Sequence, residues 1–195
     1  MYRTVLFLIM LMCLGRAAEG TLVGSPHDFS ALGGSPCGYC HTIHNGLGGT
    51  GLLTPTFGPF PAITKIYTSV TRKIPISIAQ VSASDARICL ACHDSMNVAN
   101  LAQTNASFAY VMQKLDGNPG AYIEVDLSND HPVGFVYDKN KDRELKTPQT
   151  TRPIFGPSRD QMWCSTCHNV HDNSNGKFLV MSNDGSALCF DCHIK

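Results

Sequence analysis

The stretch Cys164-Ser-Thr-Cys-His-Asn-Val-His171 places two cysteines and two histidines close together. Its first five residues form the pentapeptide Cys-x-x-Cys-His, which occurs again at 37–41, 89–93 and 189–193. The cysteines of the four copies are Cys37, Cys40, Cys89, Cys92, Cys164, Cys167, Cys189 and Cys192. Cys13, in an apolar N-terminal run, is the ninth cysteine, so the pentapeptides use every cysteine that follows this run.

Cys-x-x-Cys-His is the attachment site of a c-type haem. Two thiols, spaced by one helical turn, add to the vinyl groups on one porphyrin edge, and the histidine then ligates the iron from one face. Zinc sites also use paired cysteines but need no histidine after each pair, and a thioredoxin-like redox motif occurs once per domain. Disulfides would leave the histidines unexplained. The sequence therefore predicts four covalently attached haem c groups, with zinc as the main alternative.

The histidine count matches this prediction. The chain has 8 histidines, and four haems with two axial positions each need that many ligands. The predicted proximal ligands end the pentapeptides and are His41, His93, His168 and His193. The predicted distal ligands are the remaining four, His27, His44, His131 and His171. We therefore expect every iron to be six-coordinate with two imidazoles.

His44 and His171 each follow a proximal histidine by three residues. On a helix such a pair projects from one side, so the second histidine cannot reach the far face of its own haem. We expect both to ligate neighbouring haems. His27 and His131 lie in segments that indicate loops, and their alternative interpretation is a surface histidine. Methionine is the other common second ligand, and Met96 follows His93 at the same offset of three.

The N-terminus indicates an export signal. A basic residue precedes the apolar run 5–14, whose ten residues form about 15 Å of helix, too short for a hydrocarbon core of about 30 Å. Residues 1–20 are therefore predicted to be a signal peptide, with a membrane anchor as the alternative, and residues 21–195 a single tetrahaem domain. Because the order lone histidine, extended motif, plain motif occurs twice, we expect two-haem units at about 21–120 and 121–195.

The rest of the chain predicts little regular structure. Short strands are expected at 62–70 and 121–127, a helix at 97–115, and loops at 45–61 and 139–152. Ser84 and Ser186 are predicted helix N-caps. The expected fold class is mostly irregular, with short α-helices and few short strands, organised as a multihaem cytochrome c fold around four haems. The porphyrins are expected to supply much of the apolar interior.

Charge excludes some partners. The chain has 15 basic and 15 acidic side chains, and cleavage after residue 20 removes Arg3, Arg16 and Glu19, which leaves a net charge of −1. A nucleic-acid-binding protein would show a basic patch, so nucleic acid is not an expected partner. Beyond the signal no segment is apolar enough to predict a transmembrane helix.

These motifs resemble those of multihaem c-type cytochromes with paired Cys-x-x-Cys-His motifs. More narrowly, the chain resembles the tetrahaem outer-surface cytochromes of metal-respiring bacteria that polymerise into conductive filaments. The resemblance rests on the four pentapeptides, the extensions to His44 and His171, the segment Asn129-Asp-His-Pro-Val-Gly-Phe135 and the early His27. It implies an extracellular or cell-surface location, a homopolymeric filament and redox-protein partners. It also implies that one axial histidine, here His27, can come from the neighbouring subunit.

The expected function is long-range electron transfer without enzymatic activity, because saturated irons leave no position for a substrate. Two alternatives stay open. A soluble periplasmic tetrahaem shuttle would keep His27 on a haem of its own chain. A multihaem reductase would need an open iron, which the histidine count disfavours.

Overall fold

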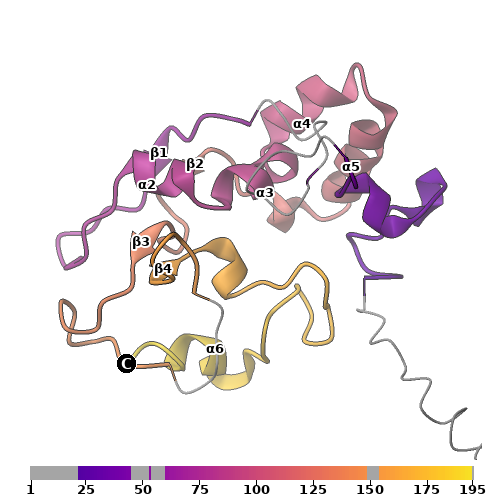
Figure 1. Cartoon of the computed structure of the whole chain (residues 1–195). Helices are drawn as coiled ribbons and strands as arrows, with labels where there is room; N and C mark the ends of the chain where they lie inside the picture. Colours follow the sequence, from indigo (N-terminus) through magenta and orange to yellow (C-terminus); the bar gives the residue numbers. More distant parts are fainter. Residues whose placement is uncertain (1–21, 45–52, 54–59, 149–153, 195) are drawn as a thin grey trace, which may run out of the picture.

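A computed structural model describes residues 22–44, 53, 60–148 and 154–194 (Figure 1). The predicted signal peptide and most of the predicted loop 45–61 lie outside these ranges. The described chain is mostly loop and turn with short helices and two-residue strands, which confirms the irregular fold expected from the sequence. No helix in these ranges is both long and apolar enough to cross a bilayer.

Four α-helices follow one another in the upper half of Figure 1. They are α2 (Ile78–Ala83), α3 (Ala86–His93), α4 (Ser95–Ala102) and α5 (Ala106–Asp116). Polar side chains fix their starts. Ser77 and Gln80 form a capping box at α2, in which each side chain accepts from the backbone N–H of the other. Asp94 caps α4 by accepting from the backbone N–H of Asn97 at 2.9 Å.

The single helix predicted at 97–115 is wrong, because the structure divides this segment between α4 and α5. The division falls at Asn105, whose side chain accepts from the backbone N–H of Ser107 at 2.9 Å and so caps α5. Asparagine favours caps over helix interiors because its side chain competes for backbone N–H groups. The predicted helix end is confirmed, since Gly117 follows α5 directly.

Of the two predicted serine N-caps, the position of Ser186 is confirmed and that of Ser84 is wrong. α3 has Asp85 at its N-cap, although the Ser84 hydroxyl still accepts from the backbone N–H of Ala86 at 3.2 Å. Ser186 does precede α6 (Ala187–Phe190) but makes no side-chain cap bond. Asn183 supplies that bond instead, by accepting from the backbone N–H of Leu188.

Short 3-10 turns and strands connect the remaining chain. The turns are η1 (Ser30–Leu32), η2 (Pro36–Tyr39), η4 (Pro119–Ala121), η5 (Cys164–Thr166) and η6 (Asp184–Ser186). The strand β1 (Lys65–Ile66) pairs in parallel with β2 (Asp126–Leu127), and β3 (Phe135–Val136) pairs antiparallel with β4 (Gln161–Met162). Both predicted strand positions are confirmed, although each strand is only two residues long.

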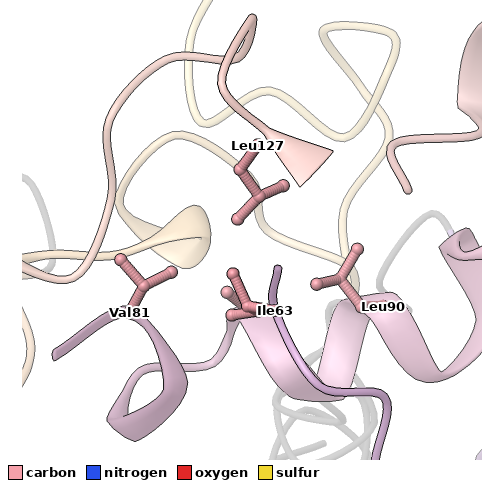
Figure 2. Packing of buried hydrophobic residues seen from close by; sticks show 5 residues of the cluster. Ile63, Val81, Leu90 and Leu127 are labelled. Carbon is pink, nitrogen blue, oxygen red and sulfur yellow. The ribbon is translucent and has the colours of Figure 1, made fainter. Parts of the chain in front are cut away.

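Among the described residues, buried hydrophobic side chains form three small clusters. In the first, Ile63 lies between Val81, Leu90 and Leu127, which brings α2, α3 and β2 together (Figure 2). The second contains Ile74, Phe135, Met162 and Cys192, and the third contains Val98, Phe108 and Leu115. A protein-only domain of this length normally buries one continuous core. The divided core agrees with the expectation that cofactors supply part of the interior.

Gly134 holds the loop that carries His131 against α2. Its φ is +77°, and an added Cβ would lie 2.6 Å from the Cα of Val81. Its backbone N–H donates to the carbonyl of Met162 at 2.6 Å, which fixes the loop on β4. Gly176 has a similar φ of +71°, but a Cβ there would meet nothing within 4 Å.

We predict that Gly134→Ala destabilises the protein more than Gly176→Ala. Both variants incur the left-handed cost of about 1–2 kcal/mol. Only Gly134→Ala adds a backbone clash, which by analogy with overpacked cores costs roughly 1–3 kcal/mol more. Thermal melts of the haem-loaded variants, followed by Soret circular dichroism, measure the difference. Equal melting temperatures for the two variants would contradict the close approach to Val81.

Candidate haem sites

Each of the four pentapeptides folds as a single helical turn. The first motif (37–41) lies on η2, the second (89–93) on α3, the third (164–168) on η5 and the fourth (189–193) on α6. In the first, third and fourth motifs the histidine backbone N–H donates to the carbonyl of the first cysteine, at 2.9, 3.0 and 2.9 Å. This bond brings both thiols and the histidine to one side of a single turn, as attachment to one porphyrin requires.

Each of three motif histidines has a second histidine ring beside it. The ring centroids of His41 and His171 are 6.0 Å apart, and those of His131 and His193 are 6.3 Å apart. His27 lies 6.0 Å from His93 in the same way. Three of the four predicted distal ligands are thus brought to a predicted proximal ligand.

These separations fit a shared iron. A metal–imidazole nitrogen bond is about 2 Å long, so two imidazoles on opposite faces of one metal have centroids about 6 Å apart. The interplanar angles are 22°, 55° and 78°, which is no obstacle, because each ring can rotate about its own iron–nitrogen bond. Among the described residues no group of three His, Cys, Asp or Glu could hold one ion. The histidines meet in twos, the number that a porphyrin iron accepts.

Backbone carbonyls select the nitrogen that faces the iron. The Nδ1–H of His93 donates to the backbone carbonyl of Ala121 at 2.6 Å. The Nδ1–H of His168 donates to the backbone carbonyl of Lys177 at 2.9 Å. His131 donates in the same way to the carbonyl of Pro132 at 2.9 Å. Because a neutral imidazole carries one proton, these bonds leave the Nε2 lone pair for a metal.

The surroundings of His27 keep its ring neutral. Burial, together with the nearby His93, Lys114 and His168, lowers its pKa from 6.5 to about 4. Only the neutral imidazole can bind a metal, so this shift keeps His27 ready as a ligand at neutral pH. The ring also stacks on Phe178, with centroids 4.4 Å apart.

Lys114 of α5 holds the loop that contains His27. The Lys114 ammonium donates to the carbonyls of Pro26 and Asp28, at 3.0 and 2.8 Å, one on each side of His27. Sequence reasoning missed Lys114 and Phe178, because both act through tertiary contacts with distant segments. For Lys114, its place near the end of a predicted helix was the only available signal.

His44 and His168 are not brought together. Within the part of the chain that the structure describes, neither ring contacts another aromatic or imidazole ring. The helix expected to join each extended motif is also wrong, because η2 ends at Tyr39 and η5 ends at Thr166. His171 still reaches a histidine of another motif, as expected, but it does so from a turn.

The attachment thiols of different motifs lie close together. Burial, together with the nearby thiols of Cys40 and Cys89, raises the pKa of Cys92 to about 12. Cys40 and Cys92 also line one cavity of about 260 Å³, together with Tyr39 and Phe108. The first motif is therefore adjacent to the second.

A second, larger cavity lies beside the third motif. Its volume is about 960 Å³, and its walls include the stacked rings of Phe155 and Trp163, the residue just before Cys164. Arg159 lines the same cavity. Aromatic walls and one cation match a porphyrin face and a propionate, so these residues fit the group that the motifs would attach.

The comparison with known proteins concerns the C-terminal part of the chain. A family model for a doubled CXXCH motif matches residues 156–195, which contain the third and fourth motifs. The match supports a protein like the multihaem c-type cytochromes and indicates covalently bound c-type haem. Attachment of c-type haem implies an exported protein. No curated protein matches the chain.

We predict that His171 serves the haem of the first motif and not that of its own motif. His171→Ala should then give one five-coordinate haem, seen as a high-spin ferric signal and as carbon monoxide binding after reduction. Removing the first haem with C37S/C40S should abolish the effect, because the iron that His171 serves is then absent.

The matched control removes the third haem with C164S/C167S. In that background His171→Ala should still open one iron. If the high-spin signal appeared in the C37S/C40S chain and vanished in the C164S/C167S chain, His171 would serve its own motif and the assignment would be wrong.

Proposed function

We propose that this chain is a tetrahaem c-type cytochrome that transfers electrons over long distances through four bis-histidine haems. The observation that carries the proposal is the meeting of His41, His93 and His193 with a second histidine at 6.0–6.3 Å. Four attachment motifs and eight histidines extend this arrangement to a fourth iron. The haems supply one-electron chemistry, while the protein fixes their spacing, ligands and surroundings.

Bis-histidine ligation suits an electron carrier. An iron with two imidazoles has no open position, so electron transfer requires little rearrangement around the metal. Two histidines also favour low reduction potentials, since an axial methionine would raise them. On this proposal the chain performs no substrate chemistry of its own.

The fourth iron would take His168 and His44. His44 is the histidine left after the other three pairs are assigned. It is exposed and lies three residues after His41, the last residue of the first motif. The carbonyl bond to Lys177 leaves Nε2 of His168 available for this iron. Within the described part of the chain His44 is not brought to His168, so we infer that this iron takes its second ligand from another copy.

We propose further that the chain assembles into an extracellular filament in which His44 reaches the third-motif haem of the next copy. The sequence resemblance names His27 as the crossing ligand. However, the centroid of the His27 ring lies 6.0 Å from that of His93 in the same chain. This favours the alternative in which His27 ligates a haem of its own chain. The exposed His44 is then better placed to cross a boundary. Other redox proteins would deliver or accept electrons at the filament ends.

The first experiment counts haems and tests their coordination. A pyridine haemochrome assay of the mature protein should give four haems per chain, and the reduced protein should bind no carbon monoxide if every iron has two histidines. Fewer than four haems would refute the tetrahaem proposal. Carbon monoxide binding by the polymeric protein would revive the reductase alternative.

A second experiment tests the filament. Negative-stain microscopy should show fibres of the wild-type protein, whereas His44→Ala should give discrete particles of about one chain with one high-spin haem. His131→Ala is the matched control, because it should open one iron inside each chain and leave the fibres intact. Discrete wild-type particles would favour the periplasmic shuttle, and intact His44→Ala fibres would remove His44 from the interface.

A third experiment tests whether the haems hold the fold together. Because the buried clusters are small, the haem-free chain should show no cooperative thermal transition by far-ultraviolet circular dichroism. The haem-loaded protein, melted under the same conditions, is the control. A cooperative melt of the haem-free chain would show that side-chain packing alone is sufficient.

A further inference from the structure

Asp85 is a buried carboxylate that bonds to a distant motif. It occupies the N-cap position of α3, yet its side chain makes no capping bond to that helix. Its two oxygens accept instead from the backbone N–H groups of Cys164 and Ser165, at 3.0 and 2.8 Å, and from the Ser165 hydroxyl at 2.5 Å. All three donors belong to the first two residues of the third motif.

These bonds join two attachment sites. Asp85 directly precedes α3, the helix that carries the second motif, and it holds the first turn of the third motif. The Cys164 and Cys89 thiols also form a hydrogen bond, which, together with burial and the nearby Asp85, raises the pKa of Cys164 well above its ordinary value. The leading cysteines of the second and third motifs are thus in direct contact.

A carboxylate suits this position physically. The start of a helical turn presents N–H groups without internal partners and favours negative charge. Hydrogen bonds to a charged acceptor are roughly twice as strong as neutral ones, so three of them hold the turn firmly. Because Asp85 is buried, its charge is screened less than that of a surface carboxylate.

We propose that Asp85 is a positioning residue that fixes the haem of the third motif against the haem of the second, and that its charge lowers the reduction potentials of these two haems. The inference rests on the proposed tetrahaem function and goes beyond it, because it assigns a residue that is neither an attachment site nor an iron ligand. A negative charge stabilises the ferric form, which carries one more positive charge than the ferrous form.

Asp85→Asn tests the effect of the charge. The variant keeps the side-chain volume and one acceptor oxygen but removes the charge. Potentiometric titration should show two of the four one-electron transitions shifted to higher potential, with the other two unchanged. Asp126→Asn is the control, since it also removes one carboxylate charge, but from a half-exposed side chain paired with Lys65. Equal shifts in the two variants, or none in Asp85→Asn, would overturn the role of the charge.

Asp85→Glu tests the positioning. It keeps the charge and lengthens the arm by one methylene, so the magnetic coupling between oxidised haems should change in electron paramagnetic resonance while the potentials stay close to wild type. Unchanged coupling would overturn the positioning role. Ser165→Ala is a milder second test of the positioning. This variant keeps the charge and removes one bond, so its coupling should change and its four potentials should not.

The haem count separates this inference from the function on which it rests. A wild-type protein with fewer than four haems refutes the tetrahaem proposal. A four-haem Asp85→Asn protein with wild-type potentials refutes only the role of the charge.

Discussion

An iron with an imidazole on each face fixes two segments of the chain relative to each other. The centroids of the two ligating rings lie about 6 Å apart, on opposite faces of one porphyrin. On the proposed ligation, His41 is tied to His171, His27 to His93 and His131 to His193. Each tie joins two residues that are far apart in the sequence. Coordination and thioether bonds can therefore stabilise the fold in place of the continuous core of other domains. Three small hydrophobic clusters are then sufficient for the remaining stabilisation.

The chemistry of the sites could be predicted from the sequence, because attachment needs a fixed local spacing that repeats four times. The irregular fold followed from the absence of long periodic segments. The pairing of histidines could not be predicted, since an offset of three suggested a helix and the structure has 3-10 turns that end at Tyr39 and Thr166. Asp85 and Lys114 were missed because they act on backbone groups of distant loops, for which no local pattern exists.

Hydrogen bonds and burial set the tautomer and charge of several imidazoles. Carbonyl acceptors at Ala121, Lys177 and Pro132 hold the Nδ1 proton of three histidines and so present Nε2 to a metal. Burial adds to this effect at His27, where it disfavours the charged ring that could not ligate. A loop histidine otherwise has many orientations and two tautomers, so these contacts favour the orientation and the tautomer that can ligate a metal.

The segment 162–171, which contains the third motif, contacts each of the other motifs. It reaches the first through His171, which lies beside His41, and the second through Asp85 and the thiols of Cys89 and Cys164. Met162, two residues before Cys164, packs with Cys192 of the fourth motif. Contacts around the third motif thus join residues from both of the units that the sequence predicts. On the tetrahaem proposal, because electron transfer between haems needs close approach, we expect paths through the haem of the third motif to be favoured over paths that follow the order of the sequence.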